Sequence, residues 1–349
     1  MYVCDGTLDD ILHRVLTKLL RARHTTASRG DSREVVGALL RLKNPRARLS
    51  RSEVKGKLFS CLGELLWYLS GTDDVNFVSY YISRYRQESE DEKTIHGAYG
   101  PRLFGGNGRP NQMDAIVELL RSARRSTRRA VIPIFEAGDI VGRMRKEVPC
   151  TTALQFLLRG KKLHLVANMR SNDAYVGLPH DVFAFTMLQE IVARKVGVEL
   201  GTYTHMVGSL HLYDEHVPMV HQYLAEGWHE SEPMPHMPVG DPQAAIEALL
   251  EAERCLRLDG ALGSSRLTSH SYWRDIVRVL QVFAVQKHED DPVKKARRLG
   301  HLRSKMASHV YDPYIERKQQ AATLAAASVP AQVQLPLFSP DPTSREDIR

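Results

Sequence analysis

The sequence has few cysteines and no long hydrophobic run, and both features narrow the class of protein. Its 349 residues include four cysteines, which lie far apart and form no CxxC pair: Cys4, Cys61, Cys150 and Cys255. This spacing argues against a zinc ribbon or a redox motif and fits a reduced cytoplasm, so no metal site is expected. No stretch has the length of a membrane span, and the N-terminal segment lacks the basic and apolar regions of a signal peptide. We therefore expect a cytoplasmic protein without a membrane partner.

Basic residues exceed acidic ones, and the excess is local. The formal net charge is +7, and the densest basic runs are RSARRSTRRA at 121–130 and NPRARLSR at 44–51. Such runs can bind nucleic acid, can bind a small phosphorylated substrate, or can simply form a solvated basic face. Charge alone leaves these three interpretations open.

Hydrophobic periodicity predicts both helices and strands around a large core. Strands are expected over 129–135, 153–158, 162–170 and 202–213, with RGKK joining the second and third as a hairpin. Helices are expected over 8–23, 52–71, 180–197, 241–258 and 270–288. The helix over 180–197 is apolar on most of its circumference, which predicts a central position. Beyond about residue 319 the composition shifts to Ala, Pro, Gln and Ser, so we expect a folded domain over 1–318 and a flexible tail over 319–349.

Three features of the sequence can carry chemistry. Cys150 follows a proline in EVPCTTA, although a lone cysteine is more often a small buried hydrophobe. Arg170 and Asp173 flank the end of a predicted strand, where they could hold a phosphate or pair with each other. Glu64 lies in the most apolar part of its predicted helix, so it must be paired, protonated or functional if it is buried.

The order and spacing of these features resemble the thymidylate synthase family, including its pyrimidine (cytidylate) hydroxymethylase branch. The resemblance covers roughly residues 25–220 through several blocks: ELLWYLSGTDDVNF, GAYGPRLFG, STRRAVIP, VPCTTALQFLL, RSNDAYVGLPHDVFAFTMLQ and GSLHLYDEH. It implies one α/β (α+β) domain over 1–318 with a large, mostly antiparallel sheet flanked by helices. It also implies an obligate homodimer formed by sheet-to-sheet packing.

The resemblance assigns a role to each matching residue. It implies a nucleophile, Cys150, that adds to C6 of a pyrimidine and so makes C5 nucleophilic. A thiol with a pKa near about 8.5 is mostly protonated at neutral pH, so a cation must favour the thiolate, and Arg170 is the leading candidate. The resemblance implies that Glu64 organises water and proton transfer around the ring, that Tyr99 belongs to the same network, and that Asp173 makes contacts near the base. For the phosphate it implies Arg29, Arg170 and Ser171, together with Arg128 and Arg129 reaching across the dimer. It implies that His211 and Tyr213 hold the sugar hydroxyl.

Asp181 stands where family members that act on dUMP have an asparagine. That asparagine donates to O4 and accepts from N3–H, whereas cytosine presents a donor at N4 and an acceptor at N3. A carboxylic acid can match cytosine, and a carboxylate can match the N3-protonated ring. Asp181 is therefore interpreted as a cytosine selector, with a simple helix cap as the alternative.

The segment after ELLW favours hydroxymethylation over methylation. The synthases usually carry a tryptophan-bearing segment of the kind IWDEW there, whereas this chain has YYISRYRQESEDEKTIHGAYG. A more open and polar site admits water, so we expect a cytidine 5′-monophosphate, methylenetetrahydrofolate and water to be the substrates. Ser171 matches the serine that is usual in the family members acting on deoxynucleotides, which favours dCMP over CMP.

Other departures from the family leave alternatives open. Thr151 and Thr152 replace a histidine that often follows the cysteine, and a long tail replaces the synthase ending that closes over folate. Methylation of dCMP or dUMP remains an alternative. A non-catalytic nucleotide- or RNA-binding protein is the other, although a nucleic acid partner is not expected because binding alone needs no nucleophile.

Overall fold

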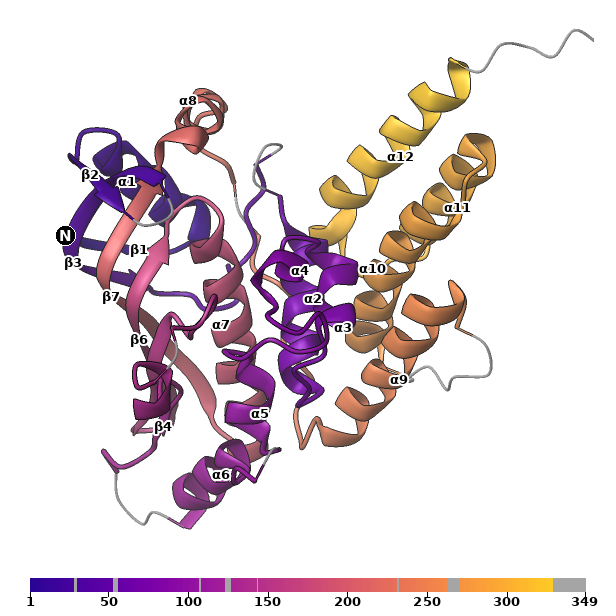
Figure 1. Ribbon diagram of the computed structural model, residues 1–349. Coiled ribbons are helices and arrows are strands. Elements are labelled where there is room, and N and C mark those ends of the chain that lie inside the picture. The colour runs from indigo at the N-terminus through magenta and orange to yellow at the C-terminus, as the bar shows by residue number, and fades with distance from the viewer. Residues whose placement is uncertain are drawn as a thin grey trace, which may run out of the picture.

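A mixed β-sheet forms one layer of the structure, and most helices lie on one side of it (Figure 1). The computed structural model describes residues 1–27, 30–52, 56–106, 108–122, 127–142, 144–230, 232–262 and 270–328. In these residues the strands are β1 (Tyr2–Asp5), β2 (Arg23–Ala27), β3 (Gly30–Leu42), β4 (Val131–Pro133), β5 (Thr151–Arg159), β6 (Lys162–Asp173) and β7 (Glu199–Tyr213). The strand order is β1-β3-β7-β6-β5-β4, with β2 paired to β3 at one edge.

The strand pairings confirm the predicted fold class. The pairs β2–β3, β3–β7, β4–β5 and β5–β6 are antiparallel, whereas β1–β3 and β6–β7 are parallel. The predicted hairpin forms between β5 and β6, where Arg159 pairs with Lys162 and Gly160 takes a positive φ of 58°. The parallel pair β6–β7 needs a crossover, and helix α7 supplies it.

The helices are interspersed with the strands along the chain. They are α1 (Leu8–Leu19), α2 (Leu58–Leu69), α3 (Val75–Tyr81), α4 (Tyr85–Glu88), α5 (Tyr99–Phe104), α6 (Gln112–Ser122), α7 (Gly177–Val196), α8 (Val217–Ala225), α9 (Gln243–Asp259), α10 (Ser271–His288), α11 (Pro292–Ser304) and α12 (Asp312–Ala327). Helix α7 packs between the sheet and α2, which explains why it is apolar on most of its circumference. Within the described ranges, no helix combines the length and apolarity needed to cross a membrane.

Several predicted boundaries were wrong. The first helix ends at Leu19 because the chain turns directly into the hairpin β2–β3, whose strands were not predicted. Helix α2 begins at Leu58 and not at Ser52, and α7 begins at Gly177, ahead of residue 180. Helix α12 continues to Ala327, so the segment predicted as a tail from residue 319 is helical over its first part. The rest of that predicted tail, 329–349, lies outside the described residues.

Candidate active site

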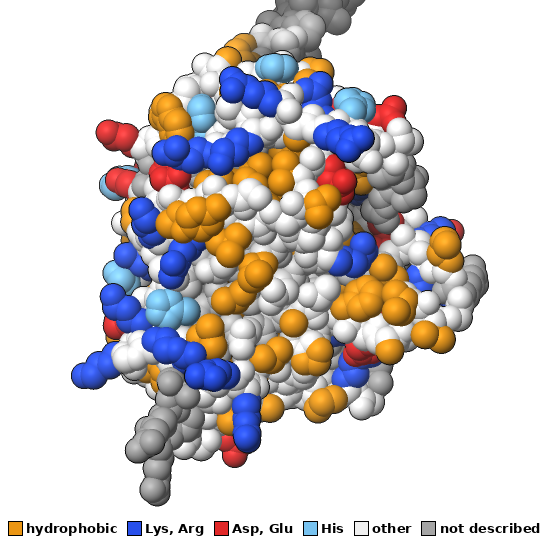
Figure 2. Space-filling model, turned by 90° about the vertical axis from the view of Figure 1, so that its left-hand side faces the viewer, with side chains coloured by type: hydrophobic (Ala, Val, Ile, Leu, Met, Phe, Trp, Pro, Cys, Tyr) orange, Lys and Arg blue, Asp and Glu red, His pale blue; other side chains and the backbone are white. Residues whose placement is uncertain are grey.

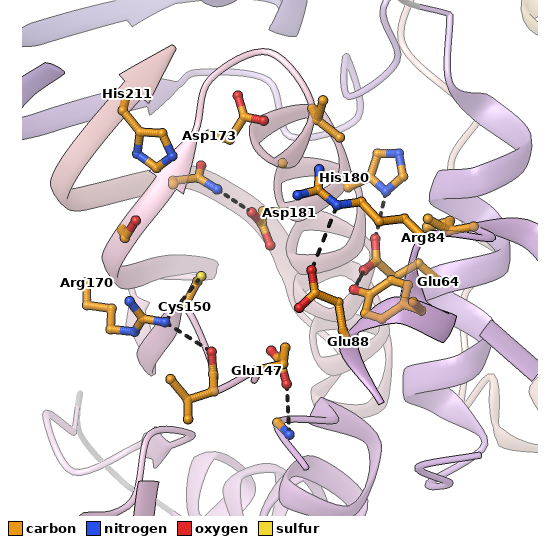
Figure 3. A pocket seen from close by; sticks show the side chains of 18 of the residues that line it. Glu64, Arg84, Glu88, Glu147, Cys150, Arg170, Asp173, His180, Asp181 and His211 are labelled. Atoms are coloured by element: carbon orange, nitrogen blue, oxygen red, sulfur yellow. Dashed lines mark hydrogen bonds and ion pairs between the residues drawn. The ribbon is translucent and has the colours of Figure 1, made fainter. Parts of the chain in front are cut away.

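A cavity of about 530 Å³ opens where β6 ends, α7 begins and α2 passes alongside (Figure 3). Its walls combine acidic, basic and aromatic side chains from segments far apart in the sequence. Nine of the residues predicted for the site line this one cavity: Glu64, Tyr99, Cys150, Arg170, Ser171, Asp173, Asp181, His211 and Tyr213. The structure therefore brings the predicted nucleophile, acid–base groups and base-recognition residue together.

Cys150 lies directly before β5, with a guanidinium beside its sulfur. Arg170 Nη2 is 3.8 Å from Cys150 Sγ (Figure 3). The same guanidinium is held in place by the carbonyl oxygens of Pro149 at 2.9 Å and Val148 at 3.1 Å. Arg170 thus binds the loop that carries the cysteine, and it does not form the ion pair with Asp173 that the sequence left open. A fixed cation at this distance stabilises a thiolate over a thiol.

Glu64 is buried and both of its carboxylate oxygens have partners. His180 Nδ1 lies 2.7 Å from Glu64 Oε2, and Tyr85 Oη donates to Glu64 Oε1 at 2.6 Å. Burial opposes the charge of Glu64, but the hydrogen bonds from His180 and Tyr85 outweigh it and lower the pKa. Burial likewise opposes the charge of His180, but Cys61 and Glu64 raise its pKa to about 10. Glu64 and His180 therefore form a buried ion pair at the cavity wall.

The phenols around this pair remain neutral. Burial raises the pKa of Tyr85 and of Tyr99 well above the ordinary value. The hydroxyl of Tyr99 accepts a hydrogen bond from the backbone N–H of Thr151 at 3.1 Å, which places it next to Cys150 in the chain. Both rings supply neutral hydroxyl groups to the network around the reacting position.

Asp181 lies in the first turns of α7 and contacts the end of β6. Its Oδ2 accepts a hydrogen bond from Asn172 Nδ2 at 2.7 Å. Because α7 begins at Gly177 with Val176 as its N-cap, Asp181 is inside the helix, and the interpretation as a helix cap is wrong. Burial and the nearby charge of Glu64 raise the pKa of Asp181 to about 7. A carboxyl group with this pKa is present in both its protonated and its ionised form near neutral pH.

Polar groups from the ends of β6 and β7 complete the cavity. Asp173 accepts a hydrogen bond from the backbone N–H of Tyr175 at 2.8 Å, which holds its carboxylate at the cavity edge. His211 and Tyr213 form an edge-to-face ring pair with centroids 4.9 Å apart. Ser171 lies on β6 directly after Arg170 and pairs with Ser209 of β7. This side of the cavity offers hydroxyl, imidazole and phenol groups to a polar ligand.

Three predicted phosphate ligands are not brought to this cavity within one chain. Arg128 and Arg129 are exposed in the segment before β4 and do not line it. Arg29 lies outside the described residues.

Sequence reasoning missed several polar residues of the site. His180 stands immediately before Asp181 in GLPHD, and Asn172 stands between Ser171 and Asp173, so their positions beside predicted residues were a usable signal. Tyr85 had no comparable signal, because a short helix, α4, brings it back against α2. Arg84 and Glu88 line the same wall and form an ion pair, with 3.8 Å between Nε and Oε1 (Figure 3).

Comparison with known proteins identifies the family. The family described as thymidylate synthase matches residues 12–252. The deoxyuridylate hydroxymethyltransferase of Pseudomonas phage M6 is 35% identical over 159 residues, which cover 45% of this chain and 45% of that protein. The protein of the same name from Bacillus phage SP01 is 30% identical over 228 residues, covering 61% of this chain and 59% of the relative. The thymidylate synthase of Bacillus subtilis subsp. natto is 31% identical over 158 residues, covering 44% and 55%.

The matched segment contains most of the cavity described above. The chain spans about half the length of the curated relatives it matches. The match over residues 12–252 covers more than half of the chain and includes the cysteine, the two acids and the arginine of the site. This chain belongs to the thymidylate synthase family.

Proposed function

We propose that the protein transfers a one-carbon unit to C5 of a cytidine 5′-monophosphate and completes the reaction with water, which gives a 5-hydroxymethyl product. The observation that carries the proposal is the carboxyl group of Asp181 in the wall that also holds Cys150 and Glu64, where burial raises its pKa. dCMP is the favoured substrate because Ser171 is the residue usual in the deoxynucleotide enzymes, and CMP is the alternative.

Asp181 supports recognition of cytosine because its carboxyl group and N3 of the ring can share one proton. Cytosine offers a donor at N4 and an acceptor at N3, so it needs one acceptor and one donor from the protein. A protonated Asp181 supplies both, and an ionised Asp181 can bind a ring protonated at N3. With a pKa of about 7, the acid form is present near neutral pH. An ordinary aspartate, with a pKa near about 3.9, would be almost wholly ionised there.

Cys150 and Arg170 support covalent activation of the ring. C5 of a pyrimidine is a poor nucleophile until a thiolate adds to C6 and moves electron density to C5. Arg170, 3.8 Å from the sulfur, favours the thiolate before this addition. Once C5 carries the one-carbon unit, loss of the C5 proton releases tetrahydrofolate and leaves an exocyclic methylene group. After water has added to this group, the Cys150–C6 bond breaks, the thiolate leaves and the C5–C6 double bond forms again.

The wall formed by Glu64, His180 and Tyr85 favours water as the last reactant. Where a tryptophan-bearing segment is usual in the synthases, the cavity is lined by Ile82, Arg84, Tyr85 and Glu88. The ionised Glu64 can accept a proton from a water molecule as its oxygen adds to the exocyclic carbon at C5. The names of the phage relatives, deoxyuridylate hydroxymethyltransferase, support the same product type.

The apolar part of the cavity supports a site for a second, partly aromatic ligand. Methylenetetrahydrofolate supplies the one-carbon unit when it is bound. Trp67 and Ile82 line the cavity with an aromatic and an aliphatic side chain. We propose that these residues hold the folate.

A homodimer would complete the phosphate site. The sheet face on the left of Figure 1 is not covered by α2, α7, α9 or α10, and in Figure 2 apolar and basic side chains share that side of the molecule. Val36 on β3 and Met206 on β7 are exposed at 78% and 40%. We propose that this face packs on a second copy and that Arg128 and Arg129 reach the phosphate in the partner.

The second candidate function is hydroxymethylation of dUMP, and the names of the phage relatives favour it. A direct test supplies methylenetetrahydrofolate with dCMP, CMP or dUMP in separate reactions and identifies each product by mass. We expect a hydroxymethyl product from dCMP, with the folate released as tetrahydrofolate and not oxidised to dihydrofolate. A methylated product with dihydrofolate, or a product from dUMP alone, would contradict it.

A further inference from the structure

A buried chain of hydrogen bonds leads from the core of the sheet to Asp181. Tyr203 Oη lies 2.6 Å from His205 Nδ1, and both side chains are on the same face of β7. His205 Nε2 lies 2.9 Å from Asn172 Oδ1, and Asn172 Nδ2 donates to Asp181 Oδ2 at 2.7 Å. Tyr203, His205 and Asn172 are each at most 4% exposed. This series of hydrogen bonds therefore ends at Asp181, the residue proposed to read the base.

These hydrogen bonds can be donated in only one direction, from Tyr203 towards Asp181, if every polar hydrogen is to have an acceptor. Burial lowers the pKa of His205 to about 3, so the ring is neutral and carries one N–H. If Tyr203 donates to Nδ1, Nε2–H donates to Asn172 Oδ1 and the Asn172 amide donates to Asp181, so each of these donors has an acceptor. In the opposite direction the Tyr203 hydroxyl hydrogen has no acceptor among the described residues. An unsatisfied buried donor costs about 1–3 kcal/mol, which favours the first direction.

This direction makes Asp181 Oδ2 an acceptor. If Asp181 is protonated, its proton is then on Oδ1. Gly177 packs closely against this contact, because a Cβ added there would lie 3.0 Å from the Asn172 amide nitrogen and 3.7 Å from Asp181 Oδ2. Asn172 therefore gives the carboxyl group a fixed polarity, with one donor oxygen and one acceptor oxygen.

We propose that Asn172 is a specificity-determining positioning residue: by fixing the polarity of Asp181, it allows that side chain to match the edge of only one pyrimidine. The inference rests on the proposed function in one respect, namely that Asp181 faces the base. Cytosine and uracil present opposite donor and acceptor patterns at N3 and position 4. A carboxylic acid free to protonate on either oxygen could match both bases, whereas one with a fixed polarity can match only one.

The test compares base preference in variants of the full chain. Asn172→Ala removes the amide and leaves space for a water molecule that can donate or accept, and Asn172→Ser keeps a polar side chain of either sense. The control is Tyr223→Phe, which also removes the hydroxyl of a buried tyrosine, but one that donates to the carbonyl oxygen of Asp9 and does not line the cavity. We expect both Asn172 variants to bring the dCMP:dUMP ratio of kcat/KM about 10- to 100-fold closer to one. Tyr223→Phe should keep the wild-type ratio.

Nucleotide binding measured by calorimetry provides a second readout that needs no turnover. The relative affinity for dCMP and dUMP should converge in the Asn172 variants and not in Tyr223→Phe. A folded Asn172 variant with the wild-type preference, or an equal loss of preference in Tyr223→Phe, would overturn the inference. If the wild-type protein prefers dUMP, the proposed base assignment is wrong, but a preference that converges in Asn172→Ala would still support the role of Asn172.

Discussion

At the scale of single residues, burial opposes the ionisation of both Glu64 and Asp181, and the neighbouring side chains determine how far each carboxyl group is ionised. Glu64 stays ionised because His180 and Tyr85 bind both of its oxygens. Asp181 receives one hydrogen bond, from Asn172, and lies near the charge of Glu64, so its pKa rises to about 7. Two carboxyl groups in one cavity thus have different protonation states, which suits one to accept protons and the other to pair with a base.

Removal of the Cys150 sulfur should separate catalysis from binding. Cys150→Ala eliminates the nucleophile, so product formation should fall below detection, whereas calorimetry should show dCMP affinity within about threefold of wild type. Cys255→Ala is the matched control, since Cys255 lies on α9 and does not line the cavity. Residual turnover in Cys150→Ala close to the wild-type rate would rule out covalent catalysis by this residue.

The affinity for dCMP should depend on pH through Asp181. Both binding schemes share one proton between Asp181 and N3, so affinity should be highest below the Asp181 pKa of about 7. As pH rises through this value the proton is lost, and affinity should fall by about tenfold per pH unit. Asp181→Asn should remove this dependence and shift preference to dUMP. A flat profile in the wild-type protein would contradict the shared proton.

At the scale of elements, the site is built where β6 passes into α7. This one segment supplies Arg170, Ser171, Asn172, Asp173, His180 and Asp181. Helix α2 faces it with Glu64, so the ion pair between His180 and Glu64 joins α7 to α2 across the cavity wall. The distance between these two helices is therefore coupled to the geometry of the acid–base group.

His180 should act as a positioning residue for Glu64. His180→Phe removes the hydrogen bond to Glu64 Oε2 and a contribution that lowers the Glu64 pKa. That pKa should rise, so the acidic limb of the kcat profile should move to higher pH, and kcat should fall about 10- to 100-fold with KM little changed. His180→Asn, which can still present an amide donor near the Nδ1 position, should retain more activity. Equal losses in both variants with no movement of the acidic limb would indicate a purely structural role.

Gly208 should be required for the approach of β7 to β6. A Cβ at this position would lie 2.8 Å from the carbonyl oxygen of Arg170, closer than a normal contact. Gly208→Ala should therefore displace the strand that carries Arg170, lower the free energy of unfolding by about 1–3 kcal/mol, and raise KM for the nucleotide. Gly138→Ala, with nothing within 4 Å of the added Cβ, is the control. Urea unfolding of both variants tests this, and equal stability would contradict it.

Some of these elements could be predicted from the sequence and others could not, and the difference has physical reasons. Strands β5, β6 and β7 and helix α7 were predicted because apolar periodicity reflects burial directly. The β2–β3 hairpin was missed because its polar residues resemble a loop, and tertiary pairing with β7 stabilises it. The cavity residues came from the resemblance, whereas Tyr85 and His205 reach the site only through folding, which local patterns do not encode.

At the scale of the whole molecule, the helices and the open sheet face divide the structure into two sides (Figures 1 and 2). The cavity lies on the helical side of the sheet, while Arg128 and Arg129 are exposed and do not line it. A second copy packed on the open face would account for both the exposed apolar residues and the separated arginines. Oligomeric state and nucleotide affinity should then change together.

A charge placed on the open face should disrupt the proposed dimer. Val36→Asp adds an unpaired carboxylate to the proposed interface, so sedimentation should show monomers and KM for dCMP should rise at least about tenfold. Leu324→Asp is the control, because Leu324 is 73% exposed on α12, an element outside the sheet. A monomeric wild-type protein, or a dimer unaffected by Val36→Asp, would contradict the proposed interface.

The most direct test of the central claim is a competition reaction in water enriched in oxygen-18. Equal concentrations of dCMP and dUMP are supplied with methylenetetrahydrofolate, and the products are identified by mass for the wild-type protein and for Asp181→Asn. We expect the wild-type protein to convert dCMP to a hydroxymethyl product carrying the heavy oxygen, and Asp181→Asn to shift conversion to dUMP. A methyl product, an unlabelled hydroxyl group, or the same base preference in both proteins would contradict it.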